Sequence, residues 1–246
     1  VSVKTFSTSN ELNTCEEWLA VPGVPPISTA GLSGVFHAAR FFYSWSARRS
    51  MELALDSFRP DVVHLHIYYG QLTASILDPI VKRGIPIVQT LHEYKTVCAT
   101  GGLYSNGRDC ERCGGVNHWR SIGEKCNRGS ILRSALSCAE MYLSEALGSR
   151  RLIEQFVAVS EYQKGRLVKL GMSGERVQVV GNFAPLFSLR EDIDSGHMLY
   201  VGRLAHGKGL ECLIDSVAIL GAVSPVLHVV GDGELREELL QRVQRL

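Results

Sequence analysis

One stretch near the end of the chain, residues 197–232, constrains the fold more than any other. Residues 198–201 are a short apolar run that ends at Gly202, and residues 226–230 are a second such run. Short apolar runs are typical of strands that are buried on both faces of a parallel sheet. Between them, apolar residues recur at helical spacing: Leu210, Leu213, Ile214, Val217 and Ala218. The stretch therefore predicts a strand–loop–helix–strand unit of an α/β protein.

The loop between this first strand and the helix has a composition that suits phosphate binding. It contains Gly202, Gly207 and Gly209, together with the cations Arg203 and Lys208. A loop at the carboxyl end of a parallel strand that leads into a helix N-terminus is where α/β proteins bind phosphate groups. By spacing alone, a solvated turn with two surface cations is an equally good interpretation.

Composition excludes some classes of protein. The chain has 246 residues, of which 45% are hydrophobic and 21% are charged, and its net charge is +1. These values are ordinary for a globular protein of one or two domains and give no electrostatic reason to expect nucleic acid as the main partner. No apolar run reaches transmembrane length. Seven cysteines without a secretion signal favour a reducing compartment, so we expect a cytoplasmic protein.

Residues 1–181 predict a first α/β domain, because strand and helix patterns alternate along them. After a strand within residues 1–7 and a surface connection at 9–34, we expect helices at 35–58, 72–82, 130–147 and 160–170 and strands at 61–67, 85–91, 156–159 and 176–180. Ser160 and Gln163 have the spacing of a capping box at the start of the last helix. Residues 182–196 are the expected linker, and residues 197–246 the start of a second domain.

Both ends of the chain look incomplete in this pattern. A strand-like run begins at Val1, which is not a methionine, and a further helix pattern is still running at Leu246. The few elements after residue 196 are too few to bury their own apolar faces. We therefore expect the chain to be a fragment whose second domain is truncated, and we expect these 246 residues alone to be inactive.

Residues 93–129 interrupt the α/β rhythm with a weakly periodic insertion rich in glycine, cysteine and arginine. Its cysteines are Cys98, Cys110, Cys113 and Cys126. The Cys-x-x-Cys pair can hold one ion from a single turn, and two further thiolates would complete a tetrahedral zinc site that orders a long loop. His118 or His92 could replace one ligand, and free or disulfide-bonded thiols are the alternatives.

The chain resembles the retaining, nucleotide-sugar-dependent glycosyltransferases of the family-four type, which have a GT-B fold of two Rossmann-like domains. The resemblance rests on Arg59-Pro-Asp-Val-Val-His-Leu-His, Gly84-Ile-Pro-Ile-Val-Gln-Thr-Leu-His-Glu-Tyr, Val157-Ala-Val-Ser-Glu, Leu199-Tyr-Val-Gly-Arg-Leu with Lys208-Gly, and Val230-Gly-Asp-Gly-Glu-Leu. These segments occur in the family's order across residues 35–246. A glycine-rich loop after the first strand and a pair of glutamates spaced eight apart, which the family also has, do not occur within these residues.

The resemblance implies the site residues. Arg203 and Lys208 would hold the donor diphosphate, and His92, at the end of its strand, would contact the donor sugar. The remaining residues that it implies for the donor site are Gly202, Ser160, Gly231 and Gly233. Ser160 also suits a helix cap, and the two last glycines also suit a tight turn. His64 is expected to pack in the sheet, whereas His66 would line the cleft that we expect between the two domains.

The expected reaction is transfer of a sugar from a nucleoside diphosphate to a glycan or glycolipid acceptor, with retention at the anomeric carbon and by front-face displacement. The chemistry would need no cofactor, so any zinc would be structural. One alternative is a nucleotide-sugar epimerase on the same two-domain plan. Another is a zinc-stapled module that binds nucleic acid through Arg108, Arg112, Arg120 and Arg128. The same cations would also suit a peripheral contact with the inner face of a membrane.

Overall fold

The structure is a computed structural model that describes residues 1–8, 18–21, 39–183 and 196–246. It divides into two compact units, Val1–Phe183 and Ala184–Leu246. The division falls inside the predicted linker, most of which lies outside the described residues. Each unit is α/β, as the sequence predicts, and each contains a parallel sheet.

The main sheet of the first unit has four parallel strands in the order β3–β4–β7–β8. The strands are β3 (Val63–Leu65), β4 (Ile87–Leu91), β7 (Gln155–Ala158) and β8 (Val177–Val179). The four strands lie side by side in the order in which they occur along the chain, as expected when a crossover segment connects each parallel strand to the next one of the sheet. All four carboxyl ends therefore meet at one edge of the sheet, and side chains placed just after the strands are brought together.

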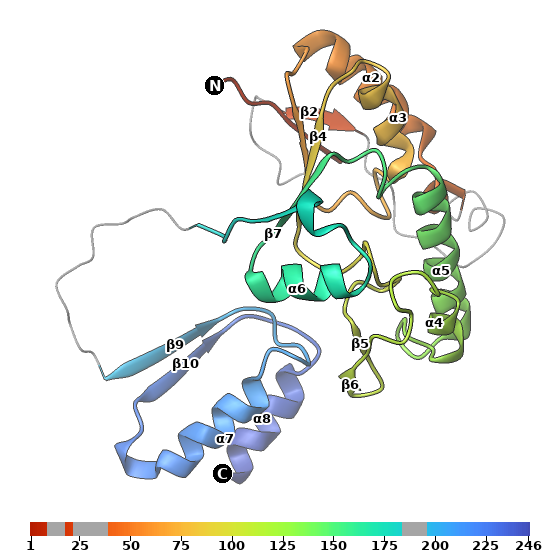
Figure 1. The fold of residues 1–246 in the computed structure, drawn as a ribbon. Coiled ribbons are helices and arrows are strands. Elements are labelled where there is room, and N and C mark those ends of the chain that lie inside the picture. Colours follow the sequence, from red (N-terminus) through yellow and green to blue (C-terminus); the bar gives the residue numbers. More distant parts are fainter. Residues whose placement is uncertain (9–17, 22–38, 184–195) are drawn as a thin grey trace. The chain divides into compact units, whose positions relative to one another are not determined.

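Helices precede the first of these strands and connect the others (Figure 1). They are α2 (Trp45–Phe58), the short η1 (Ala74–Ile76) with α3 (Leu77–Val81), α5 (Ile131–Ala146) and α6 (Glu161–Lys169), followed by η2 (Gly174–Arg176). Helices α2 and α3 pack side by side, and their apolar faces enter a core with the strands. Side chains of that core that are fully buried include Ile76, Ile80, Ile87, Phe156 and Leu167.

Capping chemistry sets the helix ends. Ser44, Ser130 and Ser160 each accept a hydrogen bond from a backbone N–H of the following first turn. Helix α2 ends at Arg59, which has a left-handed φ of 49° and precedes Pro60. The predicted ends at residue 59, at Ser130 and at Ser160 are therefore confirmed.

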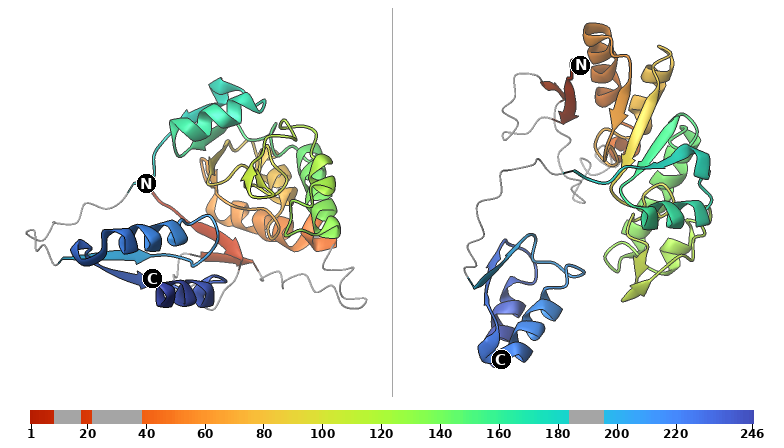
Figure 2. Two further views of the ribbon diagram at one scale, coloured as in Figure 1. Left: turned by 90° about the horizontal axis from the view of Figure 1, so that it is seen from below. Right: turned by 60° about the vertical axis from the view of Figure 1, so that its left-hand side comes forward.

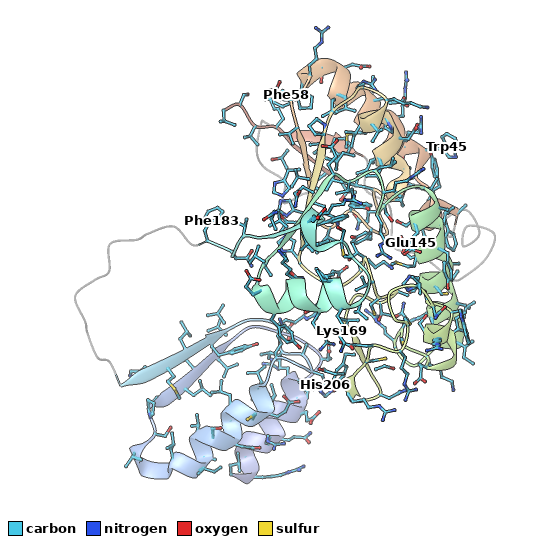
Figure 3. The ribbon with its side chains drawn as sticks, viewed as in Figure 1. Trp45, Phe58, Glu145, Lys169, Phe183 and His206 are labelled. Atoms are coloured by element: carbon cyan, nitrogen blue, oxygen red, sulfur yellow. The ribbon has the colours of Figure 1, made fainter. Side chains whose placement is uncertain are left out.

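Some predicted bounds are wrong. Residues 35–58 are not one helix, because Ser44 caps a helix that starts at Trp45, which together with Phe58 marks the two ends of α2 in Figure 3. Strand β2 (Trp18–Val21) lies in the predicted surface connection and pairs in parallel with β1 (Thr5–Thr8). The rest of that connection, apart from these four residues, lies outside the described residues. In the capping box, the Gln163 side chain accepts from the N–H of Val159 and not from that of Ser160.

The insertion has few regular elements. They are the two-residue strands β5 (Tyr104–Ser105) and β6 (Arg108–Asp109), which pair antiparallel, and the four-residue α4 (Arg120–Gly123). Helix α4 packs against α5. Among the described residues, no helix combines the length and the apolarity needed to cross a membrane.

The second unit contains the predicted strand–loop–helix–strand stretch. Strands β9 (His197–Val201) and β10 (Val226–Val230) pair in parallel, and α7 (Leu210–Leu220), η3 (Gly221–Val223) and α8 (Arg236–Arg245) complete the unit. Both long helices run along the same pair of strands (Figure 2). They enclose a small core of Leu204, Leu210, Ile214, Leu235 and Leu239. The opposite face of β9 is open, because Leu199 and Val201 are 67% and 69% exposed.

Candidate functional site

In the loop after β9, hydrogen bonds fix the backbone, whereas the two cationic side chains form no ion pair with the described residues. Leu204 is 5% exposed, and its N–H donates to the carbonyl of Asp232 at 2.9 Å. Arg203 and Lys208 are exposed, and no ion pair engages either side chain within the described part of the chain. His206, which Figure 3 labels in the same loop, lies 3.4 Å from Glu211. The loop therefore presents two unpaired positive charges on a fixed support.

The helix that follows this loop adds backbone donors. Helix α7 begins after Gly209, whose φ is 74°, and no side chain caps its N-terminus. The first N–H groups of an α-helix have no partner within the helix, and the helix dipole makes this end positive. With Arg203 and Lys208 beside it, this N-terminus has the chemistry that binds phosphate groups.

Gly231 and Gly233 are required by the fold itself. A Cβ atom on Gly231 would overlap the carbonyl oxygen of Gly202, and a Cβ atom on Gly233 would overlap that of Leu204. Their φ values of 152° and 159° also disfavour other residues. Close packing of the two strand ends thus accounts for both glycines, whatever contact they make with a ligand.

In the first unit, two histidines meet at the carboxyl edge of the sheet. His66 follows β3 and His92 follows β4, and His66 Nδ1 lies 2.8 Å from His92 Nε2 with the rings stacked. Both rings are exposed. His64 does not pack in the sheet as expected, because its side chain is exposed and lies 2.8 Å from the hydroxyl of Thr90. One face of β3 and β4 therefore carries a row of polar side chains that ends in the His66–His92 pair.

Glu93 is a candidate that the sequence analysis missed. It follows His92 directly, and burial raises the pKa of its carboxyl group. Its side chain occupies the space beside Gly101, where a Cβ would lie 3.0 Å from the carboxylate. The backbone N–H of Tyr94 donates to the carbonyl of Gly101 at 2.9 Å, so the turn that starts the insertion fixes this carboxylate next to His92. The signal in the sequence that could have identified Glu93 is its position just after a predicted strand.

Ser160 lies at the same edge as the start of α6. Its Oγ accepts a hydrogen bond from the N–H of Gln163 at 3.2 Å, and the residue is exposed. The capping role is confirmed. A role of Ser160 in donor binding stays a prediction.

We expect His66 to be neutral at pH 7. Its pKa is lowered from 6.5, because neighbouring atoms partly desolvate the ring and because charged His64 and His92 would repel a second charge. As pH falls below 6.5, the unfolded chain takes up this proton first, so the free energy of unfolding of the first unit decreases there. NMR titration of the imidazole Cε1–H signals, assigned with His66→Asn, should give a midpoint below 6.5. A midpoint at or above 6.5 would contradict the expectation.

The four cysteines of the insertion line one cavity. Cys98, Cys110, Cys113 and Cys126 all contribute to its wall, and its volume is about 20 Å³. Burial and the three neighbouring cysteines raise the pKa of the Cys113 thiol to about 11. Neither histidine proposed as a substitute ligand lines this cavity. His118 is fully buried and instead lies 3.3 Å from Glu145 of α5, a residue labelled in Figure 3.

These thiols do not form a preassembled metal site. Within residues 1–8, 18–21, 39–183 and 196–246, no three or more His, Cys, Asp or Glu side chains have a geometry that could hold a metal ion. The cations of the insertion are partly engaged, since Arg112 pairs with Glu124 and Arg120 donates to the carbonyl of Arg112 at 2.7 Å. These contacts leave fewer free charges for a nucleic acid than the sequence suggests.

Comparison with known proteins gives one match to a family model and several structural likenesses. The model of Glycosyltransferase Family 4 matches residues 14–186. One similar structure is the lipopolysaccharide outer core galactosyltransferase WaaB in its apo form, with 16% identity and a TM-score of 0.43 over 93% of this chain and 49% of that one. Another is UDP-N-acetylglucosamine 2-epimerase from Rickettsia bellii, with 12% identity and a TM-score of 0.34 over 82% of this chain and 46% of that one. A third is UDP-GlcNAc 2-epimerase from Neisseria meningitidis bound to UDP-GlcNAc, with 16% identity and a TM-score of 0.36 over 82% of this chain and 50% of that one. The chain spans about half the length of each. A search of curated protein sequences returned no match.

Proposed function

The chain belongs to Glycosyltransferase Family 4, and we propose that the protein moves a sugar from a nucleoside diphosphate donor to a carbohydrate or lipid-linked acceptor. The observation that carries this proposal is the family match, which extends over more than half of the chain. The polar carboxyl edge of the first unit and the cationic loop of the second add support from geometry.

The donor diphosphate would bind at the loop after β9. When the bond to the anomeric carbon breaks, negative charge develops on a phosphate oxygen, and charges that are already in place stabilise it most effectively. Arg203, Lys208 and the N-terminus of α7 supply such positive charge on a backbone that Leu204 anchors. In this proposal, protein groups alone stabilise the leaving diphosphate.

The sugar would lie against the histidine pair of the first unit. His92 offers a ring nitrogen on an exposed side chain, and the contact with His66 fixes the orientation of its ring. Such positioning favours reaction by holding the anomeric carbon near the acceptor hydroxyl. We propose front-face displacement with retention, in which the leaving phosphate helps to deprotonate the acceptor.

The reaction is tested by following the label of a nucleotide sugar in the full-length protein. A panel of uridine, guanosine and adenosine diphosphate sugars, each labelled in the sugar, would be incubated with glycan and glycolipid acceptors. Incorporation of label into an acceptor, with the anomeric configuration retained by NMR, is the expected result. Label that stays on the nucleotide in an epimerised sugar would instead establish an epimerase.

We expect His92→Ala to lower kcat/KM about tenfold, because one lost hydrogen bond to the sugar is worth about 1.4 kcal/mol. His64→Ala is the matched control, since His64 lies on the same sheet face and bonds to Thr90. Steady-state kinetics with the donor found above would compare the two. Equal values for His92→Ala and for the unchanged protein would remove His92 from the site.

A further inference from the structure

Four thiols from separate parts of the insertion point to the same small cavity. Cys98 lies six residues after His92, Cys110 and Cys113 lie after β6, and Cys126 lies after α4. The cavity of about 20 Å³ is large enough for one water-sized sphere and too small for an organic ligand. Apolar side chains, among them Val97, Leu103 and Leu170, form part of its wall, and Thr100, Tyr104, Glu111 and Ser121 also line it.

The carboxylate in the cavity lining, that of Glu111, has partners elsewhere. The carboxylate of Glu111 lies 2.9 Å from Arg166 Nε and 2.5 Å from Lys169 Nζ, both on α6. His118 does not line the cavity, and its Nε2 lies 3.3 Å from Glu145. The cavity lining contains four cysteine sulfurs, and four thiolates are a ligand set of structural zinc.

The backbone between Cys110 and Cys113 is shaped to present two sulfurs from one turn. The N–H of Gly114 donates to the carbonyl of Glu111 at 2.9 Å, and the N–H groups of Val116 and Asn117 donate to the carbonyl of Cys113 at 3.1 and 2.7 Å. The Sγ of Cys126 lies 3.5 Å from the hydroxyl of Ser105 in strand β5. The turn and the two flanking segments therefore surround the cavity.

The insertion also needs a source of stability. Its strands have two residues each and its helix four, so it has little regular structure to bury a core of its own. Leu103, Asn106, Lys125 and Arg128 all have positive φ values, between 47° and 52°. Each such residue costs on the order of 1–3 kcal/mol unless surrounding contacts enforce it. A bound metal ion would offset this cost, because its binding free energy contributes directly to folding.

We propose that Cys98, Cys110, Cys113 and Cys126 bind one zinc ion as four thiolates. This ion stabilises the fold of the insertion, residues 93–129, which follows His92 in the sequence. Binding of Zn²⁺ releases four thiol protons to solvent and forms four zinc–sulfur bonds, with no change of oxidation state. Tetrahedral ligation with zinc–sulfur bonds of about 2.3 Å requires the sulfurs to close on the cavity. Metal-driven closure explains why the thiols line one cavity without already forming a metal site.

Metal analysis of the protein purified under reducing conditions tests this proposal without any activity assay. The expected content is one zinc per chain. After exchange with cobalt(II), one equivalent should give the near-ultraviolet charge-transfer bands and visible bands of a tetrahedral four-thiolate site. Absence of stoichiometric metal, with all four thiols open to a thiol reagent in the folded protein, would overturn the proposal. A mass deficit that locates disulfides among these cysteines would overturn it as well.

Variants separate metal loss from general unfolding. Cys113→Ser should abolish zinc binding, whereas Cys212→Ser should keep one zinc per chain, because Cys212 is an exposed residue of the second unit. Should Cys113→Ser fail to fold, Cys126→His supplies the second test, because a histidine ligand should retain cobalt and shift its absorption bands. Unchanged bands in Cys126→His would show that this position is not a ligand.

Removal of zinc should expose the insertion to trypsin. Chelation of the folded protein under reducing conditions should produce new cuts after Arg108, Arg112, Arg120, Lys125 and Arg128, while cuts in the second unit stay unchanged. Mass spectrometry of the fragments gives the cut sites. The same cleavage pattern with and without chelator would contradict the structural role of the ion.

Discussion

Replacement of Arg203 by alanine should lower turnover about a hundredfold in the full-length protein. The proposal places Arg203 against a diphosphate whose charge grows as the glycosidic bond breaks, and loss of one such contact costs about 2.7 kcal/mol of activation free energy. The side chain is exposed and engages no ion pair among the described residues, so its removal leaves no buried partner behind. The effect should therefore appear in kcat with the fold intact.

Two further variants sharpen this prediction. Arg203→Lys should recover part of the lost turnover, because lysine keeps the charge and loses the paired donors of the guanidinium group. Arg236→Ala is the matched control in the same unit, since Arg236 is 57% exposed and, within the described part of the chain, pairs with Glu237 alone, at 3.0 Å. Turnover is measured by nucleotide release, and folding by circular dichroism. Near-normal turnover in Arg203→Ala would reject the assigned role, as would an equal loss in Arg236→Ala.

Local patterns in the sequence were enough to predict much of the fold. Apolar runs placed β4, β7, β9 and β10, and serine caps placed the starts of α5 and α6, because these signals act within a few residues. Strand β2 was missed because residues 18–21 stand in a segment rich in proline and glycine, where the local signal favours a loop. Its pairing with β1 depends on a contact that no local pattern encodes.

The part of the site that a sequence motif marks was predictable, whereas the part that depends on strand register was not. The Cys-x-x-Cys spacing marked the cysteines as candidate ligands, and the four line one cavity, whereas zinc binding stays a prediction. The contact between His66 and His92 depends on the pairing of Leu65 with Gln89 across β3 and β4. A slip of two residues would keep every side chain on its face and bring His64 toward His92 instead, so the apolar pattern cannot select the pair. Glu93 was missed for a different reason, because its burial comes from the turn at Gly101, which no local pattern of the sequence encodes.

Replacement of Glu140 by glutamine should destabilise the first unit by about 3–5 kcal/mol, the usual cost of removing one partner of a buried ion pair. Glu140 Oε2 lies 2.7 Å from Lys95 Nζ, and the two side chains are only 4% and 11% exposed. Lys95 also donates to the carbonyl of Ala99, the residue after Cys98, at 2.6 Å. The change would remove the carboxylate that pairs with the Lys95 ammonium group in the interior, leaving Glu93 as a weaker negative neighbour, and it would loosen the turn that positions Glu93.

Urea unfolding followed by tryptophan fluorescence measures this loss for the first unit alone, because the chain's three tryptophans, at positions 18, 45 and 119, all lie within that unit. Asp56→Asn is the matched control. Its partner Arg83 lies at 2.6 Å, but the two side chains are 64% and 31% exposed, so the expected cost is below about 1 kcal/mol. The double change Lys95→Met with Glu140→Leu should recover most of the lost stability, because burial of two uncharged side chains removes the unpaired charge. A loss below about 1 kcal/mol in Glu140→Gln would show that Lys95 reaches solvent or another acceptor, and that the start of the insertion does not depend on this ion pair.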